Sequence, residues 1–268
     1  MSEIRIDKSS WLTADVCPTK AWKDLRQENR AATEADLFRT EQGKELGELA
    51  RQLFPDGKLV SGSVSGNAVV ETHRLLSDPE VATVFKATFV AGDLVANPDI
   101  IQRDGDGWRV TEVESSFSDT ASLDRLICNL AYTVMVSKAA GLDVKRASLL
   151  LLSRSYRYGD PVESLFESIE QTENISEWLA DQQGRVDALA SRLRAEDPPE
   201  PRLVPACRAC PYFDNECLGK GLEHTVVSLP RLHPTRLERL GDRGIVDLGD
   251  LPPEFELSEI QDRIYQCA

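Results

Sequence analysis

Residues 93–116 read DLVANPDIIQRDGDGWRVTEVESS, a pattern that predicts two β-strands joined by a turn. The turn falls at residues 102–107, where glycine and aspartate favour a tight reversal of the chain. Glu112 and Glu114 lie two positions apart, so both side chains project from the same face of their strand. Asp99 ends the preceding strand, and antiparallel neighbours stand about 5 Å apart. The stretch therefore predicts three carboxylates at one edge of a sheet.

Carboxylates gathered in this way repel one another unless a cation neutralises them. Hard oxygen ligands of this kind suit Mg²⁺ or Mn²⁺, and such an ion can activate water and stabilise the charge that develops on a phosphorus centre. Spacing alone is equally consistent with a simpler arrangement, in which Glu112 or Glu114 faces solvent on a half-exposed sheet.

The surrounding sequence predicts an α/β fold with a mixed sheet covered by helices on both faces. Residues 84–90 are expected to form a third strand, which makes an antiparallel meander with the two strands of residues 93–116. An apolar run at residues 145–153 indicates a fully buried strand that follows a crossover helix. Helical periodicity is found at residues 35–54, 67–76 and 121–140, and a short strand is expected at residues 58–60.

Length and composition limit the class of protein. The chain has 268 residues, of which 41% are hydrophobic, so it can bury a sizeable core. It contains no apolar run long enough to span a membrane and no signal-peptide pattern at its start, which predicts a cytoplasmic protein. The net charge of −14 argues against a polyanionic partner. Half of that charge lies in residues 161–200, where apolar spacing predicts an acidic surface helix.

Three of the six cysteines form a tight cluster, CRACPYFDNEC, with the spacing Cys-x2-Cys-x6-Cys at Cys207, Cys210 and Cys217. In a reducing compartment this spacing indicates a metal or iron-sulfur site rather than disulfides. Cys17 is the candidate fourth ligand because it also precedes a proline in a turn-like context. Structural zinc and an iron-sulfur cluster both take four thiolates, so both remain open. Cys128 and Cys267 are predicted to be buried free thiols.

PDII at residues 98–101, followed by a turn and TEVESS at residues 111–116, resembles the signature of the PD-(D/E)xK, or restriction-endonuclease-like, nucleases. With one early cysteine and the late three-cysteine cluster, the chain is similar to their RecB-like branch that carries a 4Fe-4S cluster. This branch includes CRISPR-associated adaptation nucleases and the AddB nuclease module. The resemblance covers roughly residues 8–220.

The resemblance implies roles for individual residues. Asp99 and Glu112 would bind the catalytic Mg or Mn ion, and Glu48 would supply the acidic residue of the early helix, with Glu45 as the alternative. Asn129 stands where the family has a glutamine. The resemblance further implies a 4Fe-4S cluster held by Cys17, Cys207, Cys210 and Cys217.

Glu114 is the largest departure from the family, because it occupies the position of the motif lysine. A lysine there would orient the attacking water, whereas a glutamate adds negative charge and needs a metal ion or a proton. Some members of the wider fold use Glu-x-Glu with the second glutamate as a presumed base, and on that pattern Glu114 joins Asp99, Glu112 and Asn129 as a catalytic residue. A silent nucleic-acid-binding or scaffolding descendant is the rival hypothesis.

The sequence after the cysteines predicts a helical tail. We expect a nuclease domain at residues 1–222 and a tail at residues 223–268, whose leucine pattern and VDLGDLP stretch resemble a helix-hairpin-helix. Such units grip the DNA backbone, and a plain helical cap is the alternative. The candidate DNA-binding residues are Arg231, Arg236, Arg239 and Arg243.

Together these features predict a metal-dependent nuclease that hydrolyses DNA, on single strands or ends as the family suggests. The alternatives are a silent nucleic-acid-binding protein of the same fold and a structural zinc protein.

Overall fold

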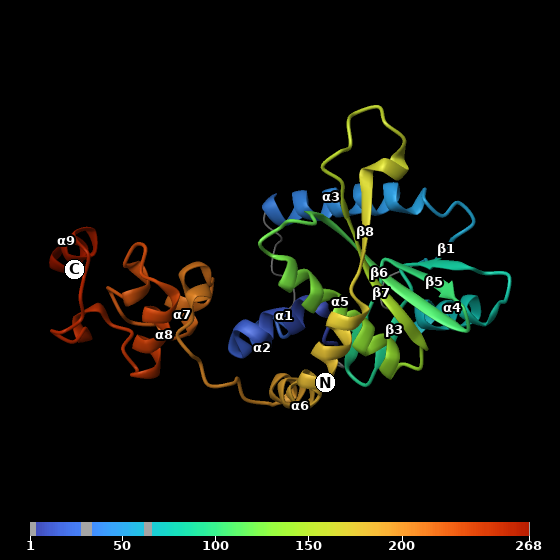
Figure 1. Cartoon of the computed structure of the whole chain (residues 1–268). Coiled ribbons are helices and arrows are strands. Elements are labelled where there is room, and N and C mark those ends of the chain that lie inside the picture. Colours follow the sequence, from blue (N-terminus) through green and yellow to red (C-terminus); the bar gives the residue numbers. More distant parts are fainter. Residues whose placement is uncertain (1–3, 28–33, 62–65, 268) are drawn as a thin grey trace. The chain divides into compact units, whose positions relative to one another are not determined.

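The computed structural model describes residues 4–27, 34–61 and 66–267, coloured along the chain in Figure 1. Contacts divide the chain into two compact units, one of residues 1–9 and 28–187 and the other of residues 10–27 and 188–268. The boundary expected after residue 222 lies inside the second unit. In the described part of the chain, no helix is long and apolar enough to cross a membrane.

A six-stranded sheet organises the first unit, in the order β1-β2-β5-β6-β7-β8 (Figure 1). The pairs β1/β2 and β6/β7 are parallel and the other pairs are antiparallel, which confirms the predicted mixed sheet. The strands of this sheet are β1 (Lys58–Leu59), β2 (Thr83–Phe85), β5 (Ile100–Asp104), β6 (Gly107–Phe117), β7 (Val144–Leu152) and β8 (Phe166–Glu170).

Helices cover both faces of this sheet, as predicted. On one face α3 (Glu34–Arg51) packs on the sheet through a cluster that contains Ala50, with Val113 of β6 packed against it. On the other face α5 (Leu123–Ala139), the crossover from β6 to the parallel strand β7, contacts Glu112 through Thr133. Adjacent residues of a strand project to opposite faces, so α3 and α5 lie on opposite sides of β6. A third helix, α4 (Gly66–Ser77), contacts β2 and β3.

The prediction of one continuous strand at residues 84–90 is wrong. Lys86 adopts the left-handed backbone conformation, with φ of 54°, and this ends β2 at Phe85. The chain then forms a separate two-stranded hairpin of β3 (Phe89–Ala91) and β4 (Leu94–Ala96). Pro98 lacks the N–H that a continued ladder would need, so β4 and β5 are separate strands. The antiparallel order β2-β5-β6 survives in the main sheet.

The acidic segment of residues 161–200 contains more than the expected helix. The short helix η1 (Val162–Leu165) leads into β8, an exposed edge strand that the sequence did not reveal, and α6 (Thr172–Arg194) follows. Within α6 the predicted apolar positions are largely buried, at Ile175, Val186, Leu189 and Leu193. At the other positions of α6 whose burial is described, acidic and polar side chains such as Glu173, Glu177 and Asp187 are exposed, as the amphipathic pattern indicates.

The second unit is helical and contains the cysteine cluster. Its apolar core joins Leu203, Cys207 and Phe213 to tail residues such as Leu237 and Leu248, so the tail and the cysteine segment share one core. The helix α1 (Lys8–Val16) runs from the first unit into the second. The remaining helices are α2 (Pro18–Asp24), η2 (Pro205–Ala209), α7 (Phe213–Glu216), η3 (Val226–Ser228), α8 (Pro234–Asp242), η4 (Leu248–Asp250) and α9 (Glu259–Cys267).

Candidate active site

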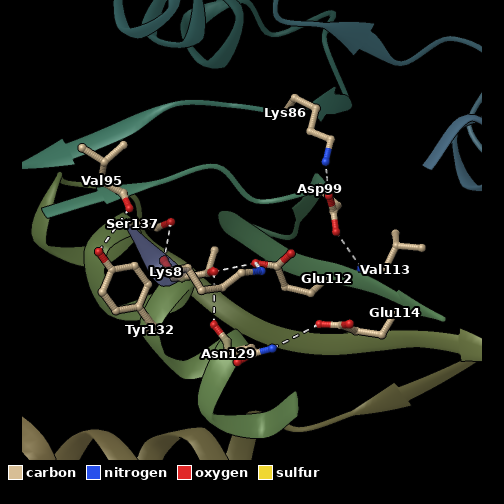
Figure 2. Close-up of polar contacts among 11 residues, drawn as sticks. Lys8, Lys86, Val95, Asp99, Glu112, Val113, Glu114, Asn129, Tyr132 and Ser137 are labelled. Carbon is tan, nitrogen blue, oxygen red and sulfur yellow. Dashed lines mark hydrogen bonds and ion pairs between the residues drawn. The ribbon is translucent and has the colours of Figure 1, made fainter. Parts of the chain in front are cut away.

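Asp99 and Glu112 lie next to each other at the two central strands of the main sheet and not at its edge (Figure 2). Ile100 pairs with Thr111 across β5 and β6, which places Asp99, just before β5, beside Glu112. The Val113 backbone N–H donates a hydrogen bond to Asp99 Oδ2 at 2.8 Å, so the carboxylate replaces a ladder partner at the point where β5 has not yet begun. The predicted convergence of these two acids is therefore present.

Glu112 is buried, with 1% of its surface exposed. Its Oε1 accepts a hydrogen bond from Thr133 Oγ1 of α5, and Lys8 Nζ lies 3.2 Å from the same oxygen. Burial raises the pKa of Glu112 to about 7, and the nearby Asp99 carboxylate acts in the same direction against the effect of Lys8. Near neutral pH this side chain can exchange a proton.

Asp99 behaves in the opposite way. Burial alone would raise its pKa, but the Lys86 ammonium outweighs it, together with hydrogen bonds that include those from Lys86 and the Val113 N–H. The net result is a pKa below the usual range, so Asp99 is ionised at neutral pH. Lys86 forms an ion pair with Asp99 Oδ1 from the left-handed position that ends β2. The pKa values of the two neighbouring acids are thus shifted in opposite directions.

Glu114 projects from the same face as Glu112, as the spacing predicted, and faces α5 (Figure 2). Asn129 Nδ2 donates a hydrogen bond to Glu114 Oε1 at 3.5 Å, and burial raises the pKa of Glu114. The structure therefore brings the predicted residues Asp99, Glu112, Glu114 and Asn129 together. The amide oxygen of Asn129 is buried and has no hydrogen-bond partner among the described residues.

Glu48 lies on the other side of β6. It lines a cavity of about 370 Å³ beneath α3, together with Lys86, Asp99 and Val113. Its side chain is 68% exposed and lies 3.8 Å from an Arg51 guanidinium nitrogen. Because Val113 and Glu112 face opposite ways, Glu48 shares this cavity with Asp99 and not with Glu112. The alternative residue, Glu45, is exposed on α3 and does not line the cavity.

The donor atoms at Asp99 and Glu112 suit a small divalent cation. Mg²⁺ is typically held by one or two carboxylates and completes its shell with water and substrate phosphates. Asp99 and Glu112 supply the two carboxylates, and Asn129, which bonds Glu114, carries an oxygen without a hydrogen-bond partner among the described residues. In the described ranges, no three or more His, Cys, Asp or Glu side chains are spaced to hold an ion together. The residues therefore fit a two-carboxylate site and do not form an all-protein cage.

The four predicted cluster cysteines belong to one unit. Cys17 caps the N-terminus of α2, where its Sγ accepts from the Lys20 N–H at 3.4 Å. Burial, with smaller effects from the charges of Cys17, Cys210 and Cys217, raises the pKa of Cys207 to about 11. Within the described ranges these thiols are not spaced to hold an ion together. Thiols that disfavour one another's ionisation are the donor set that a bound cation or cluster would stabilise.

All six cysteines are free thiols. Cys128 is partly buried, but the prediction that Cys267 is buried is wrong, because it lies exposed near the end of α9. A cysteine is usually buried for its apolar character, and the amphipathic α9 does not place this one on its packed side.

Three of the four candidate DNA-binding arginines lie around one cavity of the tail. Arg236, Arg239 and Arg243 line a cavity of about 280 Å³ that also contains Glu254 and Glu256. The Arg236 guanidinium stacks on the Phe255 ring at 4.3 Å and donates to the Glu256 carbonyl. Both of these contacts are made within the tail. Arg231 is exposed elsewhere, at a left-handed position with φ of 53°.

No protein-family model matches the sequence, and no curated protein matches it either. Two solved structures are similar to the chain: an alkaline exonuclease (LHK-Exo) from Laribacter hongkongensis, and LHK-Exo in complex with dAMP. Each is 13% identical, with a TM-score of 0.41, and the match covers 72% of this chain and 90% of the other. A similarity at this level assigns neither a reaction nor a substrate to this chain.

Several residues of the site were not anticipated. Lys8, Lys86 and Thr133 all contact Asp99 or Glu112 directly. Thr133 could have been found, because it lies one helical turn after Asn129 and therefore on the same side of α5. Lys8 reaches the site because the N-terminal segment docks on β4, and Lys86 because the chain reverses after β2. No local sequence pattern predicts either of these features.

Proposed function

We propose that this protein is a metal-dependent DNA nuclease that hydrolyses phosphodiester bonds at Asp99 and Glu112. The observation that supports this most is the contact between the two carboxyl groups, one with a lowered pKa and the other with a pKa of about 7. A buried acid in contact with a partly buried one is costly unless a function or a cation compensates for them, and such perturbed pairs concentrate at active sites.

Each residue has a distinct part in this proposal. A bound Mg²⁺ or Mn²⁺ would polarise the phosphodiester and lower the pKa of the attacking water. Asp99, fixed by the Val113 N–H and with a lowered pKa, and Glu112 would hold that ion as its two carboxylate ligands. Glu114 has a raised pKa and lies two residues further along the same face, so it is suited to accept the proton of the attacking water. Asn129 orients Glu114.

We also propose that Cys17, Cys207, Cys210 and Cys217 bind a 4Fe-4S cluster. The place of the four cysteines in one unit and the Cys-x2-Cys-x6-Cys spacing of Cys207, Cys210 and Cys217 support this. Anaerobically purified protein should be brown and contain about four iron and four sulfide ions per chain, the content of one such cluster. A colourless protein with one zinc ion per chain would instead establish a structural zinc site.

The proposed substrate is DNA, as single strands or duplex ends, in the cytoplasm. In the tail, at residues 223–268, Arg239 and Arg243 are exposed and would contact the phosphate backbone. Labelled single-stranded and duplex DNA should be incubated with Mg²⁺ or Mn²⁺ and the wild type, Asp99→Ala or Asp104→Asn. Asp104 is a matched control because it ends β5, the strand that Asp99 directly precedes, and forms ion pairs with Arg109 and Arg146 instead.

A catalytically silent DNA-binding protein is the second candidate. It is favoured by the Lys86 and Lys8 ion pairs, which already neutralise Asp99 and Glu112 without a metal ion. DNA binding by the wild type, with no cleavage at high protein concentration in either metal, would support this candidate and contradict the nuclease.

A further inference from the structure

Lys8 places a positive charge among the three acids of the site (Figure 2). Its Nζ lies 3.2 Å from Glu112 Oε1. The pKa of Lys8 is raised despite burial, because Glu112, Asp99 and Glu114 all stabilise its charged form. One ammonium therefore interacts with every carboxylate that the proposed reaction uses.

The N-terminal segment holds Lys8 in this place through Ile6. Ile6 is fully buried and forms a parallel bridge to Leu94 of β4. Its N–H donates to the Asp93 carbonyl at 2.8 Å, and its carbonyl accepts from the Val95 N–H at 2.9 Å. The Tyr132 hydroxyl donates to the same Ile6 carbonyl at 2.6 Å. Lys8 follows two residues later as the first residue of α1, so its backbone is fixed before its side chain reaches the acids.

Lys86 does not occupy an equivalent position. Its ion pair is with Asp99, on the side of the cavity beneath α3, and its side chain is 47% exposed. Lys8 instead approaches from the side of α5, the side toward which Glu112 and Glu114 project. It is the less exposed of the two, at 34%. Lys8 therefore lies on the same side of the sheet as Glu114, and its positive charge stabilises the ionised form of the Glu114 carboxyl.

We propose that Lys8 is a further catalytic residue, whose ammonium contacts the scissile phosphate and supplies the positive charge that Glu114 does not. This inference rests on the proposed nuclease function. Three carboxylates, one divalent ion and the Lys86 ammonium sum to no net charge, which leaves nothing to attract the phosphate. Lys8 at Glu112 adds the one net positive charge and stabilises the charge that develops on the phosphate in the transition state.

The test asks whether a lysine introduced at residue 114 can replace the positive charge of Lys8. Single-turnover cleavage at saturating Mn²⁺ is compared for wild type, Lys8→Gln, Lys8→Arg, Glu114→Lys and the double variant Lys8→Gln/Glu114→Lys. Lys145→Gln is the control, because Lys145 pairs with Asp106 and Asp143, away from the acids. We expect Lys8→Gln to lower the rate by about 100-fold, the loss typical of one preorganised charge-stabilising group. Lys8→Arg should retain more activity, and the double variant should recover at least tenfold.

A second readout separates catalysis from a counter-ion role. Affinity for a fluorescent single-stranded oligonucleotide is measured by anisotropy in EDTA, and folding is checked by thermal melting. Lys8→Gln should weaken binding at least threefold and Lys145→Gln should not, because only Lys8 lies where the phosphate would bind. The inference is overturned if folded Lys8→Gln cleaves within twofold of wild type at saturating Mn²⁺, or if Glu114→Lys rescues nothing. A wild type that cleaves no DNA refutes the nuclease proposal, and the anisotropy result then decides for or against the Lys8 contact by itself.

Discussion

Replacing Glu112 by glutamine should change how the stability of the protein depends on pH. The folded state holds the pKa of Glu112 at about 7, against the usual value of 4.5. Below pH 4.5 the carboxyl is protonated in both the folded and the unfolded state, so it contributes no penalty. As pH rises from 4.5 to 7 the unfolded state loses this proton first, and the free energy of unfolding falls.

The size of this effect follows from the shift. One pKa unit corresponds to 1.36 kcal/mol, so a change from 4.5 to about 7 costs up to about 3 kcal/mol above neutrality. Most of this change falls between pH 5 and pH 8. Over that interval the free energy of unfolding of the wild type should fall by roughly 2 to 3 kcal/mol because of this one group. Glu112→Gln has no proton to lose, so the variant should gain that amount relative to wild type over the same interval.

Urea unfolding in EDTA at several pH values from 5 to 8 measures the difference. Glu80→Gln is the matched control, because Glu80 is an exposed glutamate of the same unit. Asp99→Asn provides a second check. Since the Asp99 carboxylate helps to raise the pKa of Glu112, its removal should make the pH dependence shallower. A gap between wild type and Glu112→Gln that stays constant from pH 5 to pH 8 would refute the burial argument.

Three further outcomes are expected. Tyr132→Phe removes the hydroxyl that bonds the Ile6 and Val95 carbonyls, and should lower the free energy of unfolding by about 1 to 3 kcal/mol in urea titrations; an unchanged value would mean that water replaces the hydroxyl. Arg231→Gly relieves a left-handed backbone position and should leave stability unchanged or raise it by up to about 1 kcal/mol, so a clear loss of melting temperature would contradict the strain. Cys17→Ser should strip iron from anaerobically purified protein, and full retention of iron would exclude Cys17 as a ligand.

The sequence predicted the sheet and its helices well wherever one signal dominated. The apolar run of residues 145–153 became the buried strand β7, and the periodicity of residues 121–140 became α5. The strand of residues 84–90 failed because a lysine in the left-handed conformation at residue 86 is uncommon and leaves no mark on the alternation of apolar and polar residues. The edge strand β8 was missed because its exposed, acidic sequence resembles the helix that follows it.

The same contrast applies to the site. Asp99, Glu112 and Glu114 could be placed together because strand spacing and a short turn fix their relative positions. The lysines that neutralise them could not, since Lys8 depends on the docking of Ile6 onto β4 and Lys86 on a backbone reversal. Glu48 was placed beside Asp99 but on the opposite face from Glu112, a distinction that the helix pattern of α3 does not contain.

The most direct test is the rate of cleavage of labelled DNA as a function of Mn²⁺ concentration, for wild type, Asp99→Ala and Asp104→Asn. If Asp99 and Glu112 hold the catalytic ion, the wild-type and Asp104→Asn rates rise with Mn²⁺ and saturate, and Asp99→Ala stays at background at every concentration. Equal cleavage by Asp99→Ala and wild type, or cleavage by wild type that persists in EDTA, would contradict the account.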